Sequence, residues 1–177
     1  MFPSPVRFGK SYGAFDTNAV KTLNDAKTAG VKKSDVYLFP CPGKDPAAQV
    51  NGVIKGLGDA TWDFLWLDIE DNPSTGCGWS ATDFGKNCAF MTSMIHAAAG
   101  QGVGIYSSHY MWAKIMGADC TTAASLPLWY AAYDGVDSCA DFKPFGGWNH
   151  AFAHQRNDTD AGVIAQCKLS ADLNKMC

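Results

Sequence analysis

Hydrophobic positions along the chain change repeatedly between the spacing of a helix and the short apolar runs of buried strands. In DTNAVKTLNDAKTAG, apolar residues such as Leu23 recur at helical spacing until Gly30, which predicts a helix capped by Asp or Thr. The stretch DPAAQVNGVIKGLG also reads as a helix, because Pro46 falls in its first turn, where a helix accepts proline. The predicted helices cover residues 16–30, 45–58, 80–102 and 109–117.

Short apolar runs bounded by turn-forming residues separate these helices. VYLFPCP is broken by Pro40 and Pro42, and FLWLDIE is followed by the turn DNPSTGCG. The predicted strands cover residues 35–42, 64–70, 103–108, 126–133, a segment around 150–155 and one around 163–173. Helix and strand alternate over the first two thirds of the chain, which favours parallel βαβ units, whereas the end is β-rich.

Length and composition limit the class of protein. The 177 residues, 47% hydrophobic and 18% charged, predict one domain spanning residues 1–177. A net charge of −3 without a basic stripe argues against nucleic acid as a partner. No apolar run reaches the roughly 18 residues that span a bilayer, and MFPSPVRFGK lacks the apolar core of a signal peptide.

Seven cysteines are spread along the chain without a C-x-x-C pair, which disfavours a zinc knuckle or a thioredoxin-like site. Buried free thiols in a cytosolic protein are one alternative, but disulfides formed in an oxidising compartment fit this usage better. Because seven is an odd number, one cysteine is left unpaired or forms a disulfide with a cysteine outside this chain. The cysteines are Cys41, Cys77, Cys88, Cys120, Cys139, Cys167 and Cys177.

Two carboxylates end the apolar run WDFLWLDIEDN. On a strand, side chains at i and i+2 point to the same side, so Asp68 and Glu70 are expected to face one way while Ile69 faces the other. They lie at the carboxyl end of their strand, where α/β sheets and barrels place their chemistry. Two carboxylates close together cannot both ionise freely, so one is expected to have a raised pKa and to act as an acid, as glycosidic hydrolysis requires.

The D-x-E pattern alone leaves another interpretation open, in which Asp68 or Asp71 caps the next loop and Glu70 is solvated. Aromatic residues near strand ends favour the sugar-cleaving interpretation, because flat ring faces suit sugar rings, although the same residues also fit a core. These aromatics are Trp66, Trp79, Trp112, Trp129, Trp148, Tyr106, Tyr110, Tyr130 and Tyr133.

Metal and acyl-transfer chemistry are both disfavoured. His150 and His154 are four residues apart, but the H-E-x-x-H arrangement is absent and the segment is extended, so we predict no metal and no cofactor. Ser107 and His109 lie close in sequence without a G-x-S-x-G elbow, and neighbouring residues seldom form a triad.

Five motifs carry a family resemblance. In this order, VYLFPCP, LWLDIE, VGIYSS, PLWYAAYDG and FKPFGGW are similar to glycoside hydrolase family 25 lysozymes of eukaryotic type, the group with nematode and amoeboid protist enzymes. The likeness runs from about Val6 to the C-terminus. It implies an irregular TIM-like (β/α) barrel, with βα units first and a β-rich C-terminal part. It also implies N-acetylmuramidase activity on bacterial peptidoglycan.

The resemblance assigns roles to individual residues. Glu70 matches the family's catalytic acid, and Asp68 the neighbouring carboxylate that orients or stabilises the substrate's acetamido group. Asp172 matches the aspartate of the last strand that reaches the active site, although HQR departs from the aromatic that usually accompanies the family's glutamine. The expected substrate-binding residues are Trp129, Tyr130, Tyr133, Tyr106, Gln155 and Asn174.

The start of the chain departs from the family pattern. Family members begin with a strand that carries an aspartate in a pattern like x-D-x-S, then a helix, and only then reach the strand that VRFGKSYG resembles. That first strand and helix are missing here, and Asp16 matches a loop position instead. We therefore expect a barrel short of one strand and one acidic group, with two unpaired edges and reduced or lost activity.

Three functional hypotheses follow. The first is a monomeric lysozyme, secreted or lysosomal or phagosomal, that acts on bacterial peptidoglycan in antibacterial defence and has no nucleic acid or membrane partner. The alternative is a catalytically impaired peptidoglycan-binding protein. A third, a disulfide-stabilised structural domain, predicts no saccharide binding at all.

Overall fold

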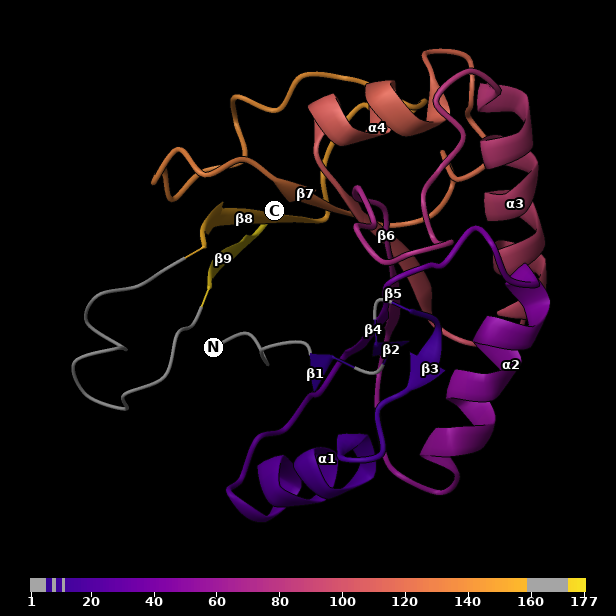
Figure 1. The fold of residues 1–177 in the computed structure, drawn as a ribbon. Coiled ribbons are helices and arrows are strands. Elements are labelled where there is room, and N and C mark those ends of the chain that lie inside the picture. The colour runs from indigo at the N-terminus through magenta and orange to yellow at the C-terminus, as the bar shows by residue number, and fades with distance from the viewer. Residues whose placement is uncertain (1–5, 8, 11, 159–171) are drawn as a thin grey trace.

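A computed structural model describes residues 6–7, 9–10, 12–158 and 172–177. The strands are β1 (Val6–Arg7), β2 (Gly9–Lys10), β3 (Ala14–Phe15), β4 (Val36–Leu38), β5 (Leu65–Asp68), β6 (Val103–Ser107), β7 (Leu128–Ala131), β8 (Ala153–Asn157) and β9 (Leu173–Met176). The helices are α1 (Ala19–Thr28), α2 (Pro46–Leu57), α3 (Phe84–Ala97) and α4 (His109–Met116). Figure 1 shows the helices along the outer side of the sheet.

The main sheet has seven strands in the order β1-β4-β5-β6-β7-β8-β9, and β2 pairs with β3 in a separate ribbon. Every neighbouring pair from β1 to β8 is parallel, and only β8 and β9 are antiparallel. This mixed α/β fold with a mostly parallel sheet confirms the predicted class and its β-rich end. The strand predicted around 163–173 falls largely outside the described residues, and β9 begins at Leu173.

Strands β1 and β9 stand at the two ends of the sheet order. Within the described ranges no pairing joins them, so the closure of the predicted barrel is not part of the observed architecture. The backbone of β1 pairs with β4 alone, through Val6 with Val36 and Arg7 with Tyr37.

Helix starts follow the capping chemistry of the sequence. The carboxylate of Asp45 accepts from the backbone N–H of Ala48 at 2.6 Å at the start of α2, with Pro46 next. At α1 the predicted Asp or Thr cap is wrong. The N-cap is Asn18, whose side chain makes no capping bond, while Asp16 Oδ1 accepts from the Asn18 N–H at 3.0 Å.

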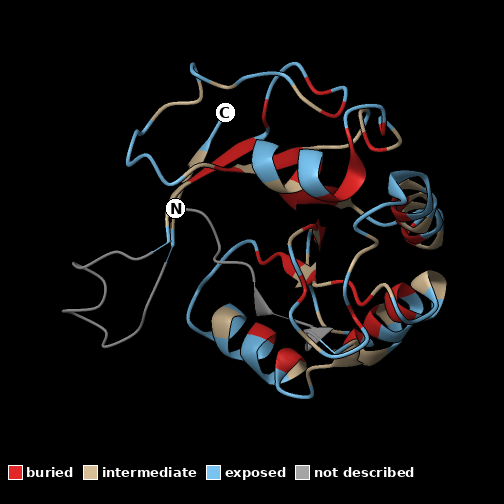
Figure 2. Cartoon of the chain, turned by 45° about the horizontal axis from the view of Figure 1, so that its top comes forward, coloured by how far each residue is buried: buried red, intermediate tan, exposed pale blue. Residues whose placement is uncertain are grey.

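Side chains on the two faces of the sheet form separate apolar clusters. The outer face packs against the helices and holds most of the core, including Leu67, Ile69 and Ile105. Figure 2 shows buried positions on the helices beside exposed ones, as amphipathic helices require. The inner face carries a smaller, aromatic-rich cluster, whose buried members are Trp66, Tyr106, Trp129, Ala131 and Ala153. Alternation along each strand explains the separation, because successive side chains point to opposite faces.

Three disulfides join segments that are distant in sequence, which confirms the prediction that the cysteines form disulfides. They are Cys41–Cys77, Cys88–Cys120 and Cys139–Cys177. Cys167 lies outside the described residues. The first disulfide connects the loop after β4 to the loop after β5.

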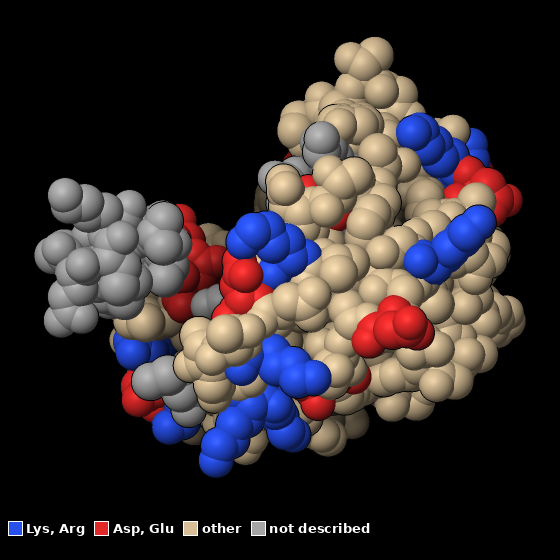
Figure 3. Space-filling model, turned by 90° about the horizontal axis from the view of Figure 1, so that it is seen from below, with Lys and Arg blue, Asp and Glu red and all other residues tan. Residues whose placement is uncertain are grey.

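Charged side chains of both signs share the surface. In the space-filling view of Figure 3, Lys and Arg lie in several groups with Asp and Glu beside them, and much of this face carries neither. Among the described residues, no helix has the length and apolar character needed to cross a membrane.

Candidate active site

The two carboxylates lie two residues apart at the carboxyl end of β5. Asp68 is the last residue of the strand, and the Ile69 N–H continues the pairing by donating to Tyr106 O at 2.8 Å. Ile69 is fully buried, whereas Asp68 and Glu70 are half-buried. A side-chain hydrogen bond links Glu70 and Asp68. The strand ends earlier than predicted, yet the two carboxylates face the same way.

Main-chain contacts hold this segment. Ser107 Oγ donates to Ile69 O at 2.9 Å, and the Trp79 indole N–H donates to Glu70 O at 2.9 Å. The Trp79 ring also meets Phe90 edge-on at 5.6 Å. Trp79 was expected only as a sugar-facing or core aromatic, and its bond to the Glu70 carbonyl depends on the path of the turn after β5, which sequence pattern does not predict.

Burial raises the pKa of Glu70, and the negative charge of Asp71 raises it further, while the hydrogen bond with Asp68 acts in the opposite direction. Asp71 is itself paired with Lys114 of α4, whose ammonium lies 5.8 Å from the Tyr110 ring centre. The net direction favours a protonated Glu70 under mildly acidic conditions, which is the state that a general acid requires.

Tyr106 on β6 connects the carboxylates to the opposite side of the site. Its hydroxyl donates to Gln155 Oε1 and lies 3.2 Å from the Tyr133 hydroxyl. Burial raises the pKa of Tyr106 far above its usual range, and the nearby charge of Glu70 adds to the effect. Tyr106 is therefore a neutral hydrogen-bond donor beside the carboxylates.

Gln155 on β8 is the centre of a chain of hydrogen bonds. Its Oε1 also accepts from the Tyr133 hydroxyl at 3.3 Å, and its Nε2 donates to Asp172 Oδ2 at 2.6 Å. Burial raises the pKa of Asp172, against the effect of the bond from Gln155. Tyr133 is exposed, so its ring is available at the surface of the site.

An aromatic floor lies beneath these polar groups. The ring of Trp129 meets Tyr106 edge-on at 4.7 Å and Trp66 at 5.7 Å. Its indole N–H donates to Asn174 Oδ1 at 2.8 Å, which joins β7 to β9. Buried indoles paired in this way are held in a fixed orientation, since both their apolar faces and their N–H groups have partners.

Of the predicted site residues, Tyr130 alone lies elsewhere. Its ring packs against the outer core and stacks on His154 at 5.1 Å, with Phe142 edge-on at 5.2 Å. The expectation that it lines the cleft beside Trp129 does not fit this position, because adjacent residues of a strand point to opposite faces. The structure brings together Asp68, Glu70, Tyr106, Trp129, Tyr133, Gln155, Asp172 and Asn174.

Two of the residues weighed for other chemistry, Ser107 and His154, have structural partners. Ser107 binds the Ile69 carbonyl, and the ring of His154 contacts the carbonyls of Ala132 and Ser138. No cluster of three metal-ligating side chains occurs in the part of the chain that the structure describes.

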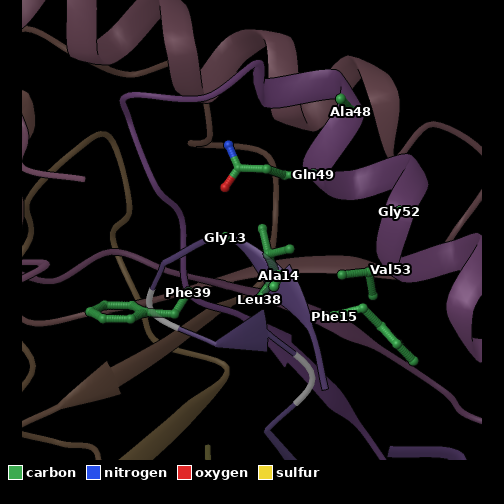
Figure 4. Close-up of a pocket in the computed structure, with 9 residues that line it drawn as sticks. All are labelled: Gly13, Ala14, Phe15, Leu38, Phe39, Ala48, Gln49, Gly52 and Val53. Atoms are coloured by element: carbon green, nitrogen blue, oxygen red, sulfur yellow. The ribbon is translucent and has the colours of Figure 1, made fainter. Parts of the chain in front are cut away.

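A small cavity of about 70 Å³ lies away from the carboxylates, between β3, the end of β4 and α2 (Figure 4). Gln49 is its polar residue, but its amide accepts from the Cys41 N–H at 2.8 Å and donates to the Cys41 carbonyl at 3.1 Å. These bonds hold the loop after β4 in place. The candidate active site is therefore the carboxylate pair at the end of β5, not this cavity.

A mostly parallel α/β sheet with two carboxylates at the end of one strand, above an aromatic floor, is typical of glycoside hydrolases. The family model described as Lysozyme-like protein 1 matches residues 6–155. The chain therefore belongs to this lysozyme-like family, the glycoside hydrolase family 25 lysozymes, which confirms the resemblance.

Curated relatives and solved structures agree with this assignment. Lysozyme-like protein 5 of Caenorhabditis elegans is 39% identical over 95% of this chain and 77% of its own length. Probable GH family 25 lysozyme 5 of Dictyostelium discoideum is 38% identical over 96% of this chain and 77% of its own length. The structure of a muramidase from Acremonium alcalophilum matches with a TM-score of 0.76 at 20% identity, covering 97% of this chain and 80% of that one, which shows the fold.

Proposed function

We propose that this protein is a lysozyme that hydrolyses the β-1,4 bond between N-acetylmuramic acid and N-acetylglucosamine in bacterial peptidoglycan. The observation that carries the proposal is the Asp68–Glu70 pair, half-buried and hydrogen-bonded, with the pKa of Glu70 raised by burial. The family's lysozyme and muramidase members support the same chemistry.

Glu70 acts as the general acid. It donates its proton to the glycosidic oxygen as the bond to the anomeric carbon breaks, so the leaving sugar departs as a neutral alcohol. Water then supplies the new oxygen on the anomeric carbon, and the proton that this water gives up restores the acid form of Glu70. Asp68 stays close to the developing positive charge and orients the substrate's acetamido group. Asp172 acts through Gln155, to which it is hydrogen-bonded, and so positions the side chains that face the sugar.

The saccharide lies against the inner face of β6 to β9. Trp129 and Tyr106 form the floor, and the exposed ring of Tyr133 gives a face on which a sugar can stack. Gln155 and Asn174 provide amide groups for its hydroxyl and acetamido substituents. Tyr130 is not part of this proposal because it packs on the outer face.

The chain is proposed to act as one domain and as a monomer, secreted or in a lysosome or phagosome. Its three disulfides support an oxidising or extracellular environment, where such bonds persist.

The test is clearing of a bacterial cell-wall suspension by the wild-type chain and by Glu70→Gln. We expect the variant to lose at least about 100-fold of the clearing rate, since it cannot donate the proton. Asp25→Asn, an exposed carboxylate of α1, is the control and should clear at the wild-type rate. If the wild type sediments with insoluble peptidoglycan without clearing it, and Glu70→Gln binds equally, the impaired binding protein replaces the enzyme.

A further inference from the structure

Tyr110, in the first turn of α4, has the highest exposure among the large hydrophobic side chains of the described residues. Its relative exposure is 68%, compared with 55% for Tyr133 on the proposed substrate side. The proposed function does not use this ring. A single exposed ring is common on protein surfaces, so the position of Tyr110 relative to the carboxylates decides what it can do.

The start of α4 lies at the same edge of the sheet as the carboxylates. Strands β5 and β6 pair in parallel, and α4 begins two residues after β6 ends. Ser107 Oγ donates to Ile69 O at 2.9 Å, which joins this end of β6 to the carboxylate segment. Because the carboxyl ends of parallel strands meet at one edge, Tyr110 stands at the edge that carries Glu70.

An ion pair brings the Tyr110 ring to the acid side of the site. Lys114, one turn further along α4, pairs with Asp71, the residue that follows Glu70. The Lys114 ammonium lies 5.8 Å from the centre of the Tyr110 ring, within the range of a cation–π contact. The ring is thus held beside the loop after β5, and the two charged side chains next to it are about half exposed.

Contacts lead away from Glu70 in two directions. In one direction, the charge of Glu70 acts on Tyr106, whose hydroxyl lies 3.2 Å from that of Tyr133. In the other direction, the ion pair of Asp71 leads to Tyr110. A bond inside a glycan strand has sugars on both sides, whereas the floor and the amide groups of β6 to β9 hold only one of them. An exposed ring beside the acid and away from that floor can hold the other.

We propose that Tyr110 is a specificity-determining residue, whose ring stacks on a sugar of the glycan strand on the leaving-group side of the bond that Glu70 protonates. The proposal rests on the proposed function, since it extends that saccharide site past the bond. A flat, exposed ring face suits a sugar ring. The contact adds affinity for long strands and nothing for substrates that end at the bond, so the protein prefers polymeric glycan to short fragments.

Two substrates separate this contact from the chemical step. The first is a long, peptide-free strand of alternating N-acetylglucosamine and N-acetylmuramic acid. The second is an aryl β-glycoside of the disaccharide N-acetylglucosaminyl-N-acetylmuramic acid, whose leaving group is not a sugar. We expect Tyr110→Ser to raise KM for the strand about fivefold and to leave kcat/KM for the aryl glycoside within about twofold of the wild-type value.

Two control variants accompany these kinetics. Tyr110→Phe keeps the ring and should match the wild type on both substrates. Phe84→Ser removes an exposed ring from α3 and should also match it on both. If Tyr110→Phe loses as much affinity for the strand as Tyr110→Ser, the ring face is not the binding group and the proposal is overturned.

A binding measurement separates this proposal from the proposed function. In a Glu70→Gln background, calorimetry with the peptide-free strand reports affinity without turnover, and we expect Tyr110→Ser to raise Kd about fivefold. A wild type that cleaves neither substrate contradicts the proposed function, while the comparison of Kd values still decides the role of Tyr110. If the Glu70→Gln protein does not bind the strand, both proposals are wrong.

The remaining outcomes each contradict the sugar contact. Equal KM values of the wild type and Tyr110→Ser for the strand show that the ring does not touch it. An equal loss on both substrates means that Tyr110 acts on the chemical step or on the fold. A loss with peptide-bearing fragments but not with the peptide-free strand assigns the ring to the stem peptide instead of a sugar.

Discussion

The two sides of the proposed saccharide site are held by different kinds of contact. The acid side, Asp68 and Glu70, is fixed through its main chain by Ser107 and Trp79. The amide side, Tyr133, Gln155 and Asp172, comes from three segments that side-chain hydrogen bonds join.

This difference predicts how each side fails. A substitution of a carboxylate on the acid side leaves the main-chain contacts in place, so it removes chemistry without moving the chain. A substitution on the amide side breaks the bonds that assemble it, because removing one partner leaves the others unsatisfied. The acid side should therefore change kcat and the amide side KM.

The strongest test of this contrast within the pair is Asp68→Asn. The amide keeps the shape and can still bond to Glu70, but it removes the negative charge near the anomeric carbon. We expect kcat to fall about 100-fold with KM within about threefold, measured with soluble peptidoglycan fragments. Asp59→Asn, an exposed residue after α2, should leave both constants unchanged. A change in KM alone would mean that Asp68 contributes to substrate binding, as the amide side does, and not to the chemical step.

Gln155→Met addresses the amide side. Methionine has a similar length but neither accepts from Tyr106 and Tyr133 nor donates to Asp172. We expect KM to rise about tenfold and kcat to fall by less than about threefold, by the same kinetics. Gln101→Met, at an exposed glutamine before β6, is the matched control. If kcat falls as far as in Asp68→Asn, the two sides do not have separate roles.

The acid side is the part of the site that could be predicted from local sequence. The alternation of strand side chains places Asp68 and Glu70 together, and the end of an apolar strand places them at the carboxyl edge. The same alternation separates Tyr130 from Trp129, which the family motif alone does not indicate. Helices and strands follow from their periodicity, whereas the cap at Asn18 depends on how Asp16 bonds locally.

The amide side depends on tertiary pairing. Gln155 meets Asp172 because β8 and β9 run antiparallel with Gln155 opposite Asn174. That register is set by the packing of the whole sheet, and the irregularity between Gln155 and Asn157 changes the pairing further along. Sequence pattern predicts the strands but not this register. The family resemblance identified Gln155, Asp172 and Asn174 as expected site residues, and the structure shows which of them contact one another.

A smaller effect concerns the stability of the acid side. A raised pKa means that folded Glu70 binds its proton more tightly than unfolded Glu70, so the free energy of unfolding decreases as pH rises through this range. Glu70→Gln removes the ionisation, and we expect its Tm at pH 7 to exceed the wild-type value by roughly 1 to 3 °C. At pH 4 the two Tm values should agree. Calorimetry that finds the variant less stable at pH 7 would show that the carboxylate stabilises the fold.

The smallest expected effect is that of the ion pair behind the acid side. Lys114 pairs with Asp71, whose charge raises the pKa of Glu70, so removing the ammonium strengthens that influence. We expect the alkaline limb of the pH–rate profile of Lys114→Met to move to higher pH, with at most about a twofold gain in rate at pH 7. Because the pair is exposed, high salt should abolish the difference, and Lys55→Met on α2 should show none. A limb that moves to lower pH would mean that Lys114 influences Glu70 by a route other than Asp71, and the acid side would then depend on side-chain contacts as the amide side does.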